Sequence, residues 1–109
     1  MLVQSFEQDN PHAADFARLG VPVQAYNHHR LIFEDRLAAL YRELAQFRPT
    51  VVIANLGAMS FEVLRYLPRG VFRIGVTHAD EAGVYDMLRH YAGVLDLMAV
   101  VSATIQKKM

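Results

Sequence analysis

The chain has 109 residues, which is enough for one domain with a buried core. Its 11 basic and 11 acidic side chains cancel to a formal net charge of zero, so nothing attracts it over long distances to nucleic acid or to an anionic membrane. The absence of cysteine excludes disulfides, thiolate metal sites and a cysteine nucleophile. We expect a compact cytoplasmic domain without a transmembrane segment, because no apolar run approaches about 20 residues.

Five short apolar runs, rich in branched residues, predict strands at 2–6, 21–26, 51–56, 71–77 and 95–101. Two of them, 51–54 and 98–101, show no polar alternation. That pattern is typical of central parallel strands that are buried on both faces.

Helical periodicity lies between the strands. The clearest helix is predicted over 30–47, where an apolar stripe recurs at helical spacing and Pro49 ends the helix at Arg48. The stripe consists of Phe33, Leu37, Leu40, Tyr41 and Leu44. A shorter helix is predicted over 10–20, with Asn10 as the N-cap, Pro11 at the first helical position and Gly20 at the end.

Three further helices are predicted at 60–67, 81–91 and from Ser102 onward, with Ser60 and Ser102 as N-caps. In the second of these helices, Tyr85, Leu88 and Tyr91 form a packing stripe, and Asp86 and Arg89 an exposed ion pair. Strands that alternate with helices predict an α/β fold, with a parallel sheet covered on both faces through right-handed crossovers.

Ligands of open α/β sheets bind beyond the carboxyl ends of the strands, so the residues after each strand are the candidates for function. Four of the five histidines follow strands in this way, although polar residues are common in such loops. The candidates at this edge are Asp9, Asn10 and His12; Asn27, His28 and His29; Asn55, Gly57 and Ser60; His78 and Asp80; and Ser102 and Thr104.

His78 is the strongest single candidate, because it follows a buried strand directly and an imidazole there can bond a sugar hydroxyl or a phosphate oxygen. Its alternative role is to satisfy loop carbonyls or to cap the next helix. Gly57 would let a ligand approach the backbone, or it marks an ordinary turn. Ser102 is read more simply as an N-cap than as a nucleophile, and the helix dipole accounts for Asp80 beside an acidic neighbour.

A metal site is not predicted. His28 and His29 are adjacent, so they point in different directions, and neither has a histidine at helical spacing.

Several stretches of the chain resemble GT-B glycosyltransferases. Residues 48–57 read RPTVVIANLG, which is similar to the family's arginine-proline-aspartate-valine-valine-histidine-alanine-histidine stretch. Residues 67–80 resemble the next strand of that family, which ends in threonine and then histidine. Residues 91–102 resemble its tyrosine-alanine, aspartate and valine-serine signature, and residues 19–23 read LGVPV, which fits a strand upstream. The chain thus resembles the amino-terminal domain of a retaining glycosyltransferase of the glycogen-synthase-like superfamily.

This resemblance implies that residues 1–109 form a single, partial Rossmann-like domain. It would have three layers, α/β/α, around a mainly parallel sheet of about five strands, and it would lack the family's first strand-helix unit. The implied reaction transfers a sugar from a nucleotide-sugar donor to a sugar, glycan or lipid acceptor, with no metal or other cofactor. We expect the isolated chain to be inactive, because the carboxy-terminal donor domain, with its paired glutamates, is missing from it.

The resemblance also assigns residues to the site. His78 matches a catalytic histidine that faces the donor sugar, and Asn55, Gly57 and Ser102 match positions that line the cleft. Asp80, two residues beyond His78, is a further substrate-binding candidate. Asn55 stands where the family often has histidine, and Thr50 where it has aspartate.

The missing first strand would lie between the strands predicted at 2–6 and 51–56. Either those two strands pair directly, or a second copy of the chain pairs with the open edge to form a homodimer. Two other functions compete with the transferase. One is a non-catalytic, flavodoxin-like or response-regulator-like binding module, although no phosphate loop or acidic pocket is present. The other is a structural fragment that serves as an assembly subunit.

Overall fold

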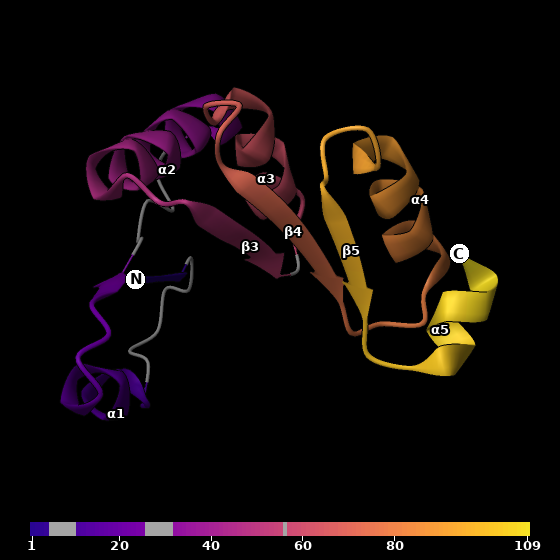
Figure 1. The fold of residues 1–109 in the computed structure, drawn as a ribbon, viewed down its shortest axis with the longest axis horizontal. Helices are drawn as coiled ribbons and strands as arrows, with labels where there is room; N and C mark the ends of the chain where they lie inside the picture. The colour runs from indigo at the N-terminus through magenta and orange to yellow at the C-terminus, as the bar shows by residue number, and fades with distance from the viewer. Residues whose placement is uncertain (5–10, 26–31, 56) are drawn as a thin grey trace. The chain divides into compact units, whose positions relative to one another are not determined.

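We analysed a computed structural model of the whole chain, which describes residues 1–4, 11–25, 32–55 and 57–109. The chain divides into two compact units, Met1–Leu40 and Tyr41–Met109, with the boundary inside one helix. Each unit is described by itself. The elements are drawn in Figure 1, and their order confirms an α/β fold with parallel strands.

The first unit contains β1 (Leu2–Gln4), α1 (Ala13–Arg18) and β2 (Val23–Ala25). β1 pairs in parallel with β2, and Leu2 lies opposite Val23. The helix predicted from Asn10 begins later, because Pro11 lies in a turn and the backbone carbonyl of His12 accepts the first helical bonds. Asn10 itself lies outside the described residues. The predicted end of this helix at Gly20 is confirmed by a φ of 71°.

The helix α2 (Phe33–Phe47) crosses the boundary between the units. It ends as the sequence predicts, because proline disfavours helical geometry in the residue that precedes it, and Arg48, immediately before Pro49, has left the helix with a φ of 53°. Of the predicted stripe, Leu44 is buried, Leu37 and Leu40 are half-buried, and Phe33 and Tyr41 are exposed.

The second unit is built on a sheet of three parallel strands in the order β3 (Val51–Asn55), β4 (Phe72–Thr77) and β5 (Leu97–Val100). The strands align Ile53 with Ile74 and Ile74 with Leu97. The described strands form a two-stranded and a three-stranded parallel sheet, and the structure does not show the predicted single sheet of about five strands.

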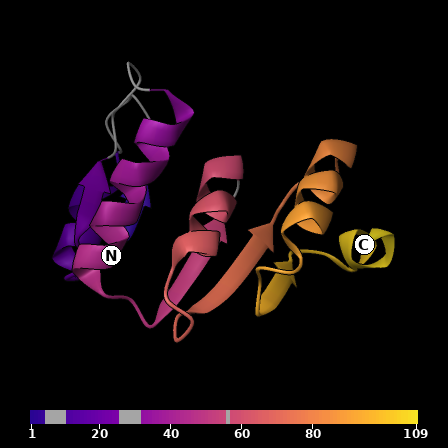
Figure 2. The same ribbon diagram turned by 90° about the horizontal axis from the view of Figure 1, so that it is seen from above.

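Two connections cross the same face of this sheet. The first contains α3 (Ala58–Glu62) and a 3₁₀ helix, η1 (Val63–Tyr66), and the second contains α4 (Ala82–Tyr91). Figure 2 shows α3 and α4 on one side of the three strands. The chain ends in α5 (Ala103–Lys108). The helix predicted at 60–67 begins earlier than Ser60, because Gly57 occupies the N-cap position, and η1 ends before Pro68.

The core of the second unit lies between the sheet and these helices. Phe61, Leu64 and Leu88 are fully buried there, and the predicted stripe of Tyr85, Leu88 and Tyr91 is confirmed as buried. Gly75 leaves room for this packing, because a Cβ at that position would come within 2.7 Å of both Phe61 and Leu95.

Arg73 ties the end of η1 to the sheet. Its guanidinium donates hydrogen bonds to the carbonyls of Leu64, Leu67 and Pro68 at 2.9 to 3.2 Å. Its backbone N–H donates to the carboxylate of Asp96 at 2.8 Å. One arginine thereby satisfies carbonyls that the end of a helix leaves without partners.

The prediction that β3 is buried on both faces is wrong. Ala54 is 2% exposed, but Val51 and Ile53 are 48% and 60% exposed. Alternate residues of a strand point to opposite faces, and within the second unit α3 and α4 lie on the same face of this sheet (Figure 2). In the last predicted strand, Val101 is likewise exposed and follows the end of β5.

Candidate functional site

Asn55 and His78 meet at the carboxyl edge of the three-stranded sheet. Asn55 is the last residue of β3, and His78 follows the last residue of β4. The strands align Asn55 with Val76, and His78 lies two residues beyond Val76, so the alternation of side chains places both on the same side. The structure thus brings together two residues that the sequence predicts only as members of one edge.

The two side chains form a direct hydrogen bond. His78 Nε2 lies 2.7 Å from Asn55 Oδ1, and both residues are exposed. An amide oxygen accepts hydrogen bonds, so His78 Nε2 is the donor in this pair. The pair presents a solvent-facing imidazole whose ring orientation is held by a side chain of the neighbouring strand.

Asp80 accepts hydrogen bonds from two side chains that no pattern in the sequence indicates as its partners. Tyr85 Oη donates to its carboxylate at 2.6 Å, and Lys108 Nζ donates to both of its oxygens at 2.6 and 2.7 Å. These bonds from Lys108 and Tyr85 hold the pKa of Asp80 below its ordinary value. The same bond to Asp80 raises the pKa of Tyr85 to about 12.

The position of Asp80 differs from the sequence interpretation. It precedes α4, whose first turn contains no acidic residue, so the carboxylate serves the two side chains rather than the helix dipole. Tyr85 lies in the following helix, but Lys108 is 28 residues away in sequence. No local pattern in the sequence signals such a pair.

Ser102 and Gly57 perform structural tasks at the same edge. Ser102 Oγ accepts a hydrogen bond from the N–H of Ile105 at 3.2 Å, which confirms the predicted N-cap of α5. Gly57 has a φ of 83°, which favours glycine, and its carbonyl accepts a bond from Ser60 Oγ. Gly57 is exposed, and a Cβ there would meet no atom within 4 Å among the described residues.

His12 and His90 do not join this pair. His12 lies next to α1 in the first unit, where Nδ1 is 3.4 Å from Asp15 Oδ2. His90 lies in α4, and its Nε2 is 3.0 Å from a guanidinium nitrogen of Arg65. The candidates at 9, 10 and 27–29 lie outside the described residues. Among the residues that the structure does describe, no three metal-ligating side chains form a group.

Arg65 belongs to a polar cluster between η1 and α4. It forms an ion pair with Glu62 at 3.1 Å, and its guanidinium lies 5.1 Å from the centre of the Tyr91 ring. Burial raises the pKa of Glu62, but hydrogen bonds from Tyr91 and Arg65 outweigh this effect and hold the pKa below its ordinary value. Burial, together with the bond to Glu62, raises the pKa of Tyr91.

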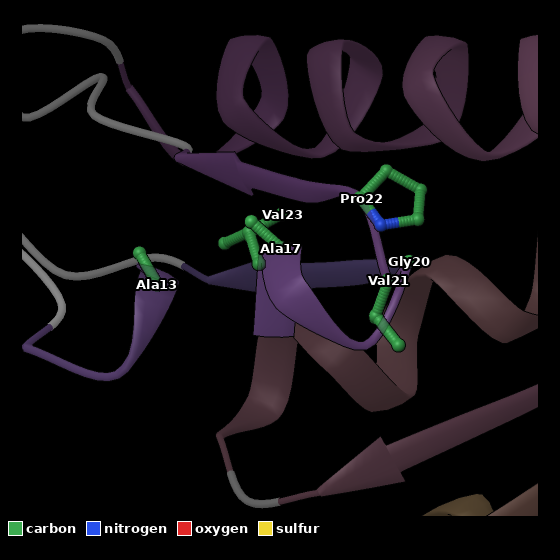
Figure 3. A pocket seen from close by; sticks show the side chains of 6 residues that line it. All are labelled: Ala13, Ala17, Gly20, Val21, Pro22 and Val23. Atoms are coloured by element: carbon green, nitrogen blue, oxygen red, sulfur yellow. The ribbon is translucent and has the colours of Figure 1, made fainter. Parts of the chain in front are cut away.

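An open hollow lies in the first unit, between α1 and β2, and is drawn in Figure 3. All the residues that line it are apolar, so it offers no group for acid–base or nucleophilic chemistry. None of the predicted site residues belongs to it. The residues that line the hollow are Ala13, Ala17, Gly20, Val21, Pro22 and Val23.

None of the described helices has both the length and the apolar character needed to cross a bilayer. Comparisons with family models, with curated proteins and with solved structures give no match to this chain. The fold and the hydrogen-bonded pair of Asn55 and His78 are therefore the observations on which a function can be argued.

Proposed function

We propose that the chain forms the acceptor-side half of the cleft of a retaining GT-B glycosyltransferase, with His78 facing the transferred sugar. One observation carries this proposal: the 2.7 Å bond that fixes an exposed imidazole at the carboxyl edge of parallel strands. Ligands of such sheets bind at that edge, and an imidazole there can bond a sugar hydroxyl. The motif that places a histidine after Thr77 supports the same role.

The proposal gives each residue at the edge a different task. His78 contacts the sugar, and Asn55 orients His78. Gly57 allows the ligand to approach the backbone, because nothing lies within 4 Å of the position that a Cβ would take. Ser102 and Asp80 shape the edge through the N-cap of α5 and the bond to Lys108.

The proposal also implies a wider architecture. The two parallel sheets would belong to one Rossmann-like sheet of about five strands, and a donor-binding domain outside these 109 residues would hold the nucleotide-sugar. The parallel pairing in both sheets supports this interpretation. The isolated chain would bind sugar weakly and would not transfer it.

Binding can be tested by NMR titration of the isotope-labelled chain with UDP-glucose, GDP-mannose, glucose and maltose. We expect shift changes centred on Asn55, Gly57 and His78, and their loss in His78→Ala. The control is His12→Ala, which alters an exposed histidine in the other unit. Shift changes confined to the hollow between α1 and β2, or none with any of the four compounds, would contradict the proposal.

A second candidate function, an assembly module, is favoured by the uncovered face of the three-stranded sheet. Val51, Ile53, Phe72 and Leu97 are 46 to 60% exposed on that face, and none of the residues that β3, β4 and β5 place on it carries a charge. Parallel sheets are almost always covered on both faces. A second copy of the chain fits this face, because two uncharged faces of a chain with zero net charge do not repel each other.

The area of the face limits the strength of such a dimer. Three strands spaced about 4.8 Å apart, with about 3.3 Å per residue, give a footprint of roughly 14 by 17 Å. A stable interface buries about 800 Å² per partner, so stacking of this face alone supports only weak association. Open backbone groups on β3, which pairs only with β4 among the described strands, would add to it.

Light scattering over a wide range of concentrations tests this second function. We expect reversible dimers that Ile53→Lys abolishes, whereas Arg42→Glu, an exposed change in α2, leaves them intact. A monodisperse monomer at the highest concentration would contradict it.

A further inference from the structure

Two histidines of the second unit form hydrogen bonds through Nε2, one with a hydrogen-bond acceptor and the other with a donor. His78 Nε2 faces the amide oxygen of Asn55 at 2.7 Å, and His90 Nε2 faces a guanidinium nitrogen of Arg65 at 3.0 Å. A neutral imidazole carries one proton, so one ring nitrogen donates and the other accepts. The partner of each Nε2 therefore decides which nitrogen holds the proton.

The chemistry of Arg65 fixes the tautomer of His90. A guanidinium group has only donors and stays charged, so His90 Nε2 must accept and the proton must lie on Nδ1. Arg65 is held in place by the ion pair with Glu62 at 3.1 Å and by the ring of Tyr91. The neutral ring of His90 is therefore the Nδ1–H tautomer.

The chemistry of Asn55 fixes the other tautomer on His78. The amide oxygen only accepts, so Nε2 carries the proton and Nδ1 keeps a free lone pair. His78 is exposed, and its Nδ1 has no hydrogen-bond partner among the described residues. We propose that Asn55 is a positioning residue that holds His78 as the Nε2–H tautomer, so that Nδ1 accepts a hydrogen bond from a ligand hydroxyl.

This inference rests on the proposed function and narrows its substrate class. An accepting Nδ1 is satisfied by a neutral hydroxyl, which a sugar supplies. It is not satisfied by a deprotonated phosphate or carboxylate oxygen, because such an oxygen is itself only an acceptor. The pair therefore selects the sugar portion of a ligand rather than its phosphate portion.

The tautomers can be read without any ligand from the ring ¹⁵N shifts of the labelled chain, at a pH well above the ordinary titration range of histidine. We expect Nε2–H at His78 and Nδ1–H at His90. An unconstrained histidine already favours the Nε2–H form, so variants that reverse the partner are needed. Asn55→Asp should keep Nε2–H at His78, and Asn55→Lys, which only donates, should move the proton to Nδ1.

Arg65→Met is the matched change at the second pair, and it should return His90 to the Nε2–H form. A backbone spectrum of each variant verifies that the chain is folded, and both Asn55 and Arg65 are exposed. Nδ1–H at His78 in the unaltered chain, or Nε2–H at His78 in Asn55→Lys, would overturn the inference whatever ligand binds.

The ligand class is tested with glucose and inorganic phosphate as probes. Glucose should shift the ring resonances of His78 and phosphate should not, and Asn55→Ala should weaken glucose binding about five- to tenfold, the usual worth of one hydrogen bond. Asn55→Asp should restore most of this loss. If His78 is Nε2–H but glucose causes no shift, both the proposed function and the substrate class fail, whereas the tautomer assignment stands. A stronger response to phosphate would overturn the substrate class alone.

Discussion

The two faces of the β3–β4–β5 sheet are built from alternate residues of the same strands, yet their surroundings differ completely. On one face Ala54, Gly75 and Thr77 are buried under α3, η1 and α4. On the other face Ile53 and Leu97 are 60% and 49% exposed. The difference shows that the residue type alone does not determine burial, because both faces are predominantly apolar.

The largest expected effect is on the free energy of unfolding, when a side chain that covers the sheet is truncated and compared with one on the open face. Phe61→Ala removes a fully buried ring that covers the sheet, so the free energy of unfolding should fall by about 3–5 kcal/mol. Ile53→Ala on the open face should lower it by less than about 1 kcal/mol, because that side chain is largely in water already. Urea unfolding measures both values. Equal losses would mean that the open face is covered in solution.

The next test adds atoms to the covered face. Gly75→Ala would place a Cβ within 2.7 Å of Phe61 and Leu95, so overpacking should cost about 1–3 kcal/mol. Gly83→Ala is the control, because its Cβ meets no atom within 4 Å and α4 gains a better helix former. Thermal unfolding of the two variants should shift in opposite directions. A neutral Gly75→Ala would contradict the packing of this face.

A smaller effect concerns the hydroxyl of Thr77 on the covered face. Thr77 is fully buried, and its Oγ1 has no hydrogen-bond partner among the described residues. Thr77→Val keeps the shape and removes the unsatisfied group, so we expect stabilisation of about 1 kcal/mol in urea unfolding. The control is Val76→Thr, which puts a hydroxyl on the opposite face. A loss of stability in Thr77→Val would show that a partner of Oγ1 exists.

The smallest effect is the pH dependence of the stability contributed by Asp80, at the carboxyl edge of the sheet. Lys108 and Tyr85 hold the pKa of Asp80 below its ordinary value, so the folded state binds this proton more weakly than the unfolded state. The pair therefore stabilises the fold fully above about pH 4, and this contribution is lost as the pH falls below that value.

Asp80→Asn should accordingly be less stable than the unaltered chain near neutral pH, and the difference should shrink in acid. Thermal unfolding between neutral pH and about pH 2 follows this change. Asp86→Asn serves as the control, because Asp86 forms only an exposed pair with Arg89. If Asp80→Asn and Asp86→Asn show the same pH dependence, Lys108 and Tyr85 do not stabilise the carboxylate.

The order of elements could be predicted from the sequence, because strand and helix periods differ and Pro49, Pro68 and Gly20 mark their ends. The uncovered face could not be predicted. The run 51–54 is apolar throughout, and only the position of β3 beside a single strand, with helices on one side, decides which of these residues meet water.

The candidate site could be predicted only in part. Strand ends pointed to Asn55 and His78 separately, but their bond depends on the alignment of Asn55 with Val76, which no local pattern specifies. The partners of Asp80 were missed for the same reason, since Lys108 lies in another helix. Ser102 was predicted correctly as an N-cap because capping depends on neighbours three residues away.

The strand order of the second unit has a consequence for folding. β3, β4 and β5 are neighbours in space in the same order as in sequence, so each pairing closes a loop of one connection only. Loop closure of this kind costs less conformational entropy than pairing strands from opposite ends of a chain. The unit therefore needs no pairing between strands that are distant in sequence in order to complete its sheet.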